Sequence, residues 1–272
     1  MKRKNTIIKQ DTLIRKSAGC LLLFGVFLLS AILQGQGPVL AQEESQLAES
    51  SMWEVQLLDP SLSESELDAY FQIHEIAEGD EVYDQIYGKS YRENPHIGLE
   101  DLRYLTLLHY NFDGQIQVGE MIVNKNAAED VLDIFRELFA LKYEIQSVFL
   151  IDRYWTGDPD STDTASTKAN NTSCFNYREI TGGGNLSNHA LGLAIDLNPL
   201  QNPYVWYGED GSLQCLDENA RPYLDRTSGD PHVIVEGDVC WSVFDKYGFS
   251  WGGSWNSPID YQHFERNSSA IS

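Results

Sequence analysis

The chain has 272 residues, of which 42% are hydrophobic and 11% aromatic, and its formal net charge is −22 at pH 7. This apolar content is enough for a folded core, so the acidity does not indicate a disordered acidic chain. The strong negative charge argues against nucleic acids and anionic lipids as partners, because both are polyanions.

The first 41 residues have the layout of a secretory leader. Six Lys and Arg residues precede or begin an apolar stretch over residues 18–33, and Val39-Leu40-Ala41 resembles a signal peptidase site. We therefore predict a signal peptide over residues 1–41, a flexible tether over 42–52, and export to the cell envelope or the medium. An uncleaved membrane anchor is the alternative, although about 16 apolar residues is short of the ~20 that a spanning helix needs. Without the leader the formal net charge is −27.

Residues 53–144 carry elements of a fold but no readable chemistry. Apolar residues at helical spacing between 67 and 76 predict a short helix. Strands over 102–109 and 115–123 are predicted around an Asp-Gly turn at 113–114. A helix follows, with Asn126 as its cap, Glu129 as the partner in a capping box, and an apolar face from Val131 to Phe139.

Residues 145–266 hold the segments that we expect to carry the chemistry, and residues 267–272 form a tail. Residues 145–152 predict a buried strand. Residues 154–173, rich in Asp, Thr and Ser, predict a solvated loop rather than a calcium site, because they lack the glycine and distal Glu of an EF-hand. The order of hairpin, helix and strand predicts an α+β fold with an antiparallel sheet core and flanking helices.

Three cysteines follow the predicted leader: Cys174, Cys215 and Cys240. An odd number allows at most one disulfide within the chain in an export context. A bridge between Cys215 and Cys240 is one possibility, and three free thiols is the other.

Two histidines and two aspartates lie in apolar or glycine-rich surroundings, in residues 187–199 and 251–265. His189 and Asp196 are seven residues apart, which suits a turn that feeds a strand, and Gly192 is expected to keep side-chain bulk away from a metal. His263 comes from a distant segment, three residues after Asp260. A catalytic zinc ion takes three imidazole or carboxylate ligands and keeps one position for water, whose proton a nearby carboxylate can accept. Structural roles for these side chains are the alternative.

These two segments resemble the two signatures of the zinc D-alanyl-D-alanine peptidase family: Ser187-x-His189-x-x-Gly192-x-Ala194-x-Asp196 and Asp260-x-x-His263-Phe264. The family includes vancomycin-resistance D,D-carboxypeptidases and L-alanyl-D-glutamate endopeptidases of phage and bacilli. The resemblance implies that His189, Asp196 and His263 bind one zinc ion and that Asp260 is the general base. An aspartate as the base favours the endopeptidase branch, although Ser254 stands where that branch has Asp in Trp-Gly-Gly-Asp-Trp.

The family also uses an arginine upstream of the first ligand to stabilise the oxyanion of the tetrahedral intermediate. The resemblance implies this role for Arg178, eleven residues before His189, with Arg153 as a competitor and a surface ion pair as the alternative. Ser187 is expected to support the loop of the first ligand, since no Gly-x-Ser-x-Gly elbow surrounds it. Trp251, Trp255 and Tyr261 are expected either to stack on substrate or to pack in the core.

We therefore expect an exported zinc metallopeptidase with a hedgehog/D,D-peptidase-like fold, acting on the stem peptides of peptidoglycan. The L-Ala-D-Glu endopeptidase is favoured. The alternatives are a D-Ala-D-Ala carboxypeptidase and an inactive, zinc-containing module that binds the cell wall. We expect one zinc ion per chain, a monomer, no nucleic-acid partner, and membrane association only through an uncleaved N-terminal anchor.

Overall fold

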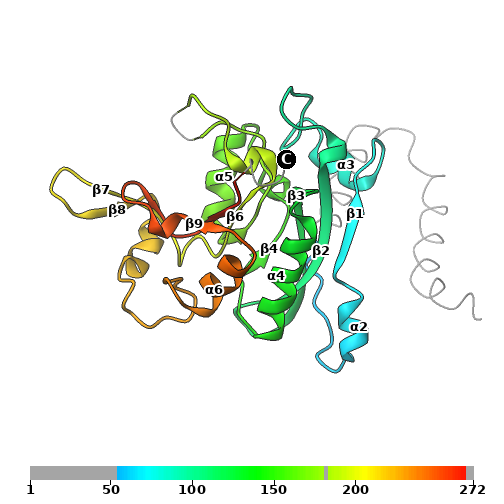
Figure 1. Ribbon diagram of the computed structural model, residues 1–272, viewed down its shortest axis with the longest axis horizontal. Helices are drawn as coiled ribbons and strands as arrows, with labels where there is room; N and C mark the ends of the chain where they lie inside the picture. Colours follow the sequence, from blue (N-terminus) through cyan, green and yellow to red (C-terminus); the bar gives the residue numbers. More distant parts are fainter. Residues whose placement is uncertain (1–53, 181–182, 268–272) are drawn as a thin grey trace, which may run out of the picture. The chain divides into compact units, whose positions relative to one another are not determined.

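In the computed structural model, which describes residues 54–180 and 183–267, a long β-hairpin is the centre of the N-terminal half (Figure 1). β2 (Leu102–Tyr110) and β3 (Ile116–Asn124) pair antiparallel along their whole length. This confirms the hairpin predicted around the Asp-Gly turn, where Gly114 has a positive φ of 71°. β1 (Gln72–Glu75) pairs with β2 and completes a sheet in the order β1-β2-β3.

The main helix, α4 (Ala128–Ala140), packs its apolar face on this sheet. Val131, Ile134, Phe135 and Leu138 are buried, which confirms the predicted amphipathic helix. Its N-cap is Ala127, however, and not Asn126. Asn124 forms the turn into the helix instead: its side chain accepts from the Asn126 amide at 3.0 Å and its carbonyl accepts from the Ala127 amide at 3.0 Å.

The short helix predicted between residues 67 and 76 is only partly right. α2 (Glu64–Asp68) is helical, but Ile73 belongs to β1, opposite Leu105 of β2. Pairing with the hairpin therefore outweighs the helical spacing of these apolar residues. A further helix, α3 (Glu81–Ile86), and a 3-10 turn, η1 (Leu99–Asp101), connect β1 to the hairpin.

The buried strand predicted over residues 145–152 is much shorter than expected. β4 (Ser147–Val148) pairs in parallel with β5 (Asn171–Thr172), and the chain then turns into the 3-10 helix η2 (Ile151–Tyr154). The solvated loop predicted over 154–173 is wrong, because it contains the helix α5 (Pro159–Lys168). Asp158 caps this helix by accepting from the Ser161 amide at 2.9 Å, and Pro159 occupies its first turn.

Two small sheets form the C-terminal half. The first, in the order β6-β11-β9, joins β6 (Ala194–Asp196), β11 (His263–Glu265) and β9 (Ser250–Trp251). The second, in the order β10-β7-β8, joins β10 (Ile259–Asp260) to the hairpin of β7 (Tyr204–Tyr207) and β8 (Leu213–Cys215). Four short helical segments complete this half: η3 (Asn188–Leu191), η4 (Glu218–Leu224), α6 (Val239–Lys246) and η5 (Gly252–Ser254).

One hydrophobic core connects the two halves. Ile195 of β6 and Phe264 of β11 are fully buried in the same cluster as Leu107 of β2 and Phe135 of α4. The mixed helices and small antiparallel sheets confirm the predicted α+β class. A closer likeness to the hedgehog/D,D-peptidase fold stays a prediction.

Residues from Val55 onward form one compact unit. The predicted leader or anchor, the tether and residues 268–272 of the tail lie outside the described residues. Cys174, Cys215 and Cys240 are all buried and free, so the alternative of three free thiols holds and a Cys215–Cys240 bridge does not form. Within the described ranges, no helix has both the length and the apolar character needed to cross a bilayer.

Candidate metal centre

A 3-10 turn and a short strand bring the first two candidate ligands together. Ser187 caps η3 by accepting from the His189 amide at 3.2 Å, the supporting role expected of it. Gly192 then ends η3 in the left-handed region, at φ 66°, and the chain enters β6 with Asp196 at its end. A Cβ at Gly192 would lie 2.6 Å from the amide nitrogen of Asn124, so this glycine is required by the backbone of β3 rather than by the metal site.

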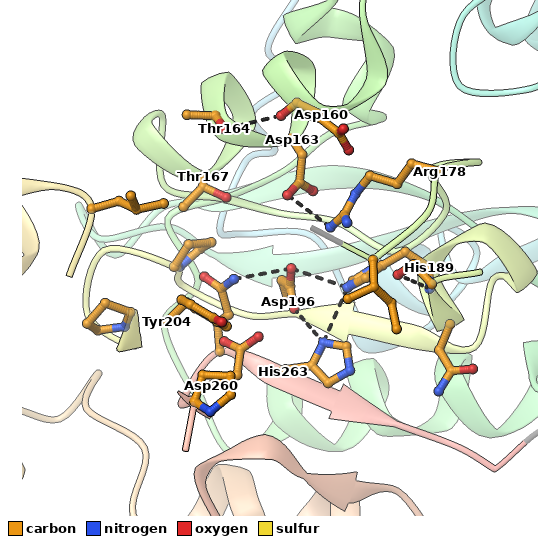
Figure 2. A pocket seen from close by; sticks show the side chains of 18 of the residues that line it. Asp160, Asp163, Thr164, Thr167, Arg178, His189, Asp196, Tyr204, Asp260 and His263 are labelled. Atoms are coloured by element: carbon orange, nitrogen blue, oxygen red, sulfur yellow. Dashed lines mark hydrogen bonds and ion pairs between the residues drawn. The ribbon is translucent and has the colours of Figure 1, made fainter. Parts of the chain in front are cut away.

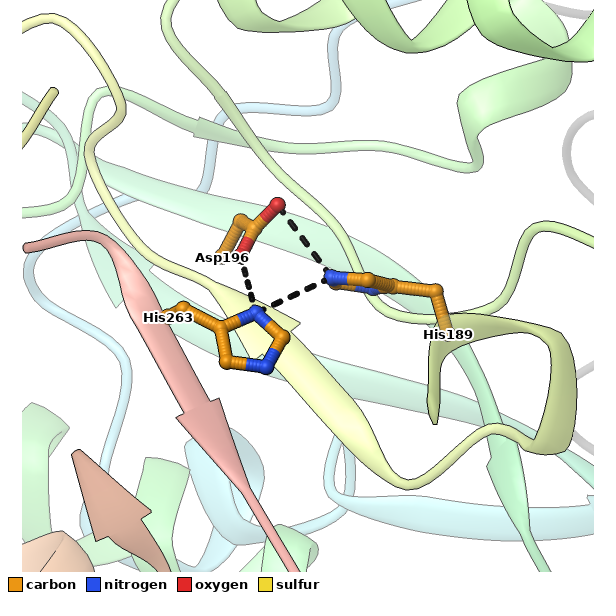
Figure 3. Close-up of side chains that lie close together, drawn as sticks. All are labelled: His189, Asp196 and His263. Carbon is orange, nitrogen blue, oxygen red and sulfur yellow. Dashed lines mark hydrogen bonds and ion pairs between the residues drawn. The ribbon is translucent and has the colours of Figure 1, made fainter. Parts of the chain in front are cut away.

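The third candidate ligand reaches the site from a neighbouring strand. His263 of β11 lies directly opposite Asp196 of β6 in the antiparallel pair. The structure therefore brings together His189, Asp196 and His263, all of them buried (Figure 3). Nε2 of His189 lies 3.3 Å from Nδ1 of His263 and 3.3 Å from Oδ2 of Asp196, and Nδ1 of His263 lies 3.1 Å from Oδ1 of Asp196.

The separation of the two imidazole nitrogens fits a tetrahedrally coordinated metal ion. Ligand atoms about 2.0–2.1 Å from a zinc ion lie about 3.3–3.4 Å from one another at tetrahedral angles. The two imidazole nitrogens, 3.3 Å apart, match that spacing, and each of them lies 3.1–3.3 Å from a different oxygen of the Asp196 carboxylate. The site thus offers three ligands of the kinds that catalytic zinc sites use.

The hydrogen bonds of the His189 and His263 rings indicate that the position between these rings and Asp196 is suited to a cation. Nδ1 of His189 donates to the carbonyl oxygen of Cys174 at 2.7 Å, and Nε2 of His263 donates to the Glu265 carboxylate at 3.1 Å. Each neutral ring therefore keeps a lone pair on its other nitrogen, and the two lone pairs face each other and the carboxylate of Asp196 (Figure 3). Only protons or a metal ion can satisfy three such acceptors in a buried site.

The close packing of these side chains shifts the pKa values of Asp196 and His263. Burial opposes ionisation of Asp196, but His189 and His263 hold the pKa of its carboxyl well below the usual range. Burial lowers the pKa of His263, but hydrogen bonds to Asp196 and Glu265 raise it to about 10.

Asp260 is the carboxylate beside this centre. It lies at the end of β10, opposite Tyr204 of β7, and its Oδ1 is buried with no partner among the described residues. Burial and the nearby charge of Asp196 raise the pKa of Asp260 to about 8. A divalent cation would favour the ionised form of Asp260, so its proton affinity is set by whether the centre holds a metal.

Arg178 lies across the cleft from Asp260 (Figure 2). Its Nη2 donates to Oδ2 of Asp163 in α5 at 2.9 Å, and its side chain is only 10% exposed. Arg153, the competing arginine, instead covers the ring of Phe149 at 3.9 Å and does not line the cleft. The geometry therefore favours Arg178 over Arg153 as the arginine that could stabilise the oxyanion.

The cleft over these residues has a volume of about 380 Å³. One wall, which sequence reasoning missed, is the polar face of α5 with Asp160, Asp163 and Thr167 (Figure 2). A second, more apolar wall comes from the segments around β7, β8 and η4. The apolar wall contains Leu200, Pro203, Tyr204, Leu216, Ala220 and Pro258.

The aromatic residues near the second signature divide between the two expected roles. Trp255 lines the cleft, is 39% exposed and lies 5.3 Å from His263 between ring centroids, so it is available to a ligand. Trp251 is buried and donates to the carbonyl of Tyr261 at 2.8 Å, so it packs in the core.

A buried His-Asp-His group beside a carboxylate and an arginine, all in one cleft, is an arrangement suited to metal-dependent hydrolases. Residues 181–266 match the family model described as D-alanyl-D-alanine carboxypeptidase, of the M15 peptidases. This segment includes His189, Asp196, Asp260 and His263, and it confirms the family resemblance of the sequence. The match supports a peptidase of a metallopeptidase family. No curated protein and no solved structure gave a significant match.

Proposed function

We propose that this chain is an exported zinc peptidase that hydrolyses the stem peptides of peptidoglycan. The observation that carries the proposal is the convergence of two imidazole lone pairs and one carboxylate in a buried site, with Asp260 at its side. The family match supports hydrolysis of a peptide, and the leader-like residues 1–41 support export.

His189, Asp196 and His263 would hold the metal. When bound, zinc supplies Lewis-acid chemistry, which polarises a peptide carbonyl and acidifies water. Asp260 accepts the proton of the attacking water and returns it to the amine that leaves, so the carboxyl is a base first and an acid afterwards. Arg178 donates to the oxygen of the scissile carbonyl as negative charge develops on it.

The bond that we favour is the L-Ala-D-Glu link, because the base is an aspartate, as in the endopeptidase branch that the sequence resembles. Removal of a terminal D-Ala is the second candidate, and the description of the matching family model favours it. A zinc-containing module without activity is the third.

Defined muropeptides distinguish these candidates. The chain without its predicted leader, loaded with zinc and then chelated, would be incubated with them and the products read by mass spectrometry. Cleavage within the stem supports the endopeptidase, and release of D-Ala supports the carboxypeptidase. Asp260→Asn should abolish either activity, whereas Asp245→Asn, on the exposed face of α6, should not. Zinc binding without any cleavage that depends on Asp260 would contradict the proposal.

A further inference from the structure

Both candidate histidine ligands make a second hydrogen bond on the side of the ring that faces away from the metal position. For His189 the partner is a backbone carbonyl, that of Cys174, which no side-chain substitution removes. For His263 the partner is the side chain of Glu265, whose Oε2 lies 3.1 Å from Nε2. Figure 3 shows this nitrogen of His263 directed away from Asp196 and His189.

Glu265 is held in place by the other ligand segment. It lies two residues after His263 in β11, and side chains two apart on a strand point to the same face. The same Oε2 accepts from Nδ2 of Asn188 at 2.6 Å, and Asn188 immediately precedes His189 in η3. One carboxylate oxygen therefore connects the strand of His263 to the turn of His189, and the Glu265 side chain is only 28% exposed.

We propose that Glu265 is a positioning residue of the metal centre, which fixes the ring of His263 with Nδ1 toward the metal and ties it to the His189 turn through Asn188. A carboxylate that accepts from the outer nitrogen of a ligating histidine fixes its tautomer and makes the ring a better donor to the metal. This inference rests on the proposed function only in taking the His-Asp-His group as a metal site.

The consequence is measurable as zinc affinity, without any assay of activity. Loss of such an outer partner typically weakens metal binding about 10–100-fold. Glu265→Ala removes the acceptor and should weaken zinc binding within that range. Glu265→Gln keeps an acceptor oxygen but no charge, so its loss should be smaller. Asn188→Ala should weaken zinc binding by a few fold, because the Glu265 carboxylate remains but contacts only His263.

The chain contains a matched control. Glu144 accepts from Nε2 of His232 at 2.9 Å, which is the same kind of carboxylate–imidazole pair outside the cleft. Glu144→Gln should leave zinc affinity unchanged.

The experiment is a chelator competition that gives the zinc Kd of the full chain and of each variant, beside the Co²⁺ absorption spectrum and the thermal unfolding of the metal-free proteins. We expect weaker zinc binding and an altered Co²⁺ spectrum for Glu265→Ala, and a cooperative unfolding transition of the metal-free variant would show that it is folded. Zinc affinities within twofold of one another for all the variants would overturn the proposal. If the unsubstituted chain binds zinc but cuts no muropeptide, the peptidase function fails while the comparison of affinities remains decisive.

Discussion

Nη2 of Arg178 donates to Oδ2 of Asp163 at 2.9 Å, across the gap between the segment that leads into η3 and the helix α5. Burial raises the pKa of Asp163, and the charge of Arg178 opposes that rise. The Nε of Arg178 is buried without a partner among the described residues. The Asp163 carboxylate on α5 and the carbonyl oxygen of Glu179, to which Nη1 donates at 3.1 Å, together set the direction in which this guanidinium faces the cleft.

The two arginines considered for the oxyanion should differ sharply in their effect on catalysis. Arg178→Lys should lower kcat roughly 10²–10³-fold with a smaller change in KM, because the donor acts on charge that develops in the transition state. Arg153→Lys should leave kcat nearly unchanged, since that side chain covers Phe149 outside the cleft. Steady-state kinetics on one muropeptide makes the comparison, and equal losses would contradict the role of Arg178.

Zinc should stabilise the folded chain through its three ligands. A ligand at about 1,000 times its Kd stabilises the native state by about 4 kcal/mol, or roughly 8–16 °C in Tm for a domain of this size. We expect that upward shift for the unsubstituted chain by calorimetry with zinc rather than chelator present. Asp196→Asn should lose most of the shift. A shift of the same size in this variant would mean that zinc binds elsewhere.

His109, a fully buried residue of β2, should make its own contribution to stability less favourable in acid. Its Nδ1 donates to the carbonyl of Ile145 at 2.8 Å, and its Nε2 is buried without a partner among the described residues. Burial lowers the pKa of His109 to about 4, against about 6.5 in the unfolded chain. The unfolded state therefore binds the extra proton first, and the contribution of His109 to stability drops by about 3 kcal/mol as the pH falls from about 6.5 to 4.

The test is urea unfolding of two histidine variants between pH 7 and pH 4. Between pH 7 and pH 4, His109→Asn should lose about 3 kcal/mol less stability than the unsubstituted chain, because no buried imidazole remains to be protonated. His74→Asn, at an exposed position of β1, should leave the slope unchanged. The same pH dependence in His109→Asn as in the unsubstituted chain would contradict this role of His109.

Two glycines with similar backbone angles should respond differently to alanine. Gly192 and Gly211 both have positive φ, at 66° and 78°, so both substitutions carry the strain of the left-handed region. Only at Gly192 would the added Cβ also meet the backbone of Asn124. We expect Gly192→Ala to lower the free energy of unfolding by about 2–3 kcal/mol and to weaken zinc binding, and Gly211→Ala to cost about 1 kcal/mol. Equal losses in denaturant unfolding would show that the contact with β3 does not matter.

The convergence of the three candidate metal ligands was predictable from sequence because local motifs and short strands position them. His189 and Asp196 are joined by one turn ended by Gly192, and His263 is placed by register against Asp196. The wall of the cleft formed by α5 was not predictable in the same way. Its two buried residues are Thr162 and Ser166, whose hydroxyls accept from the Thr156 amide and the Asn171 side chain, so the helix shows no apolar period.

The positions of the partners that hold the site were also hidden from the sequence. Asp163 lies 15 residues before Arg178, and Asn188 lies 77 residues before Glu265. Such pairs depend on how the sheets pack, which no local pattern specifies. In the sequence nothing distinguishes Asn188 and Glu265 from other polar residues, and only the fold brings them into contact.

The candidate metal ligands of the strands and the proposed base belong to different sheets. Asp196 and His263 are paired in the sheet β6-β11-β9, whereas Asp260 belongs to the sheet β10-β7-β8. Only Tyr261 and Gln262 separate Asp260 from His263 along the chain. The β7–β8 hairpin forms part of the cleft wall but supplies none of the three metal ligands. Exchanging that hairpin for another would therefore offer a route to a different substrate with the same metal affinity, provided the replacement keeps the strand that pairs with Asp260.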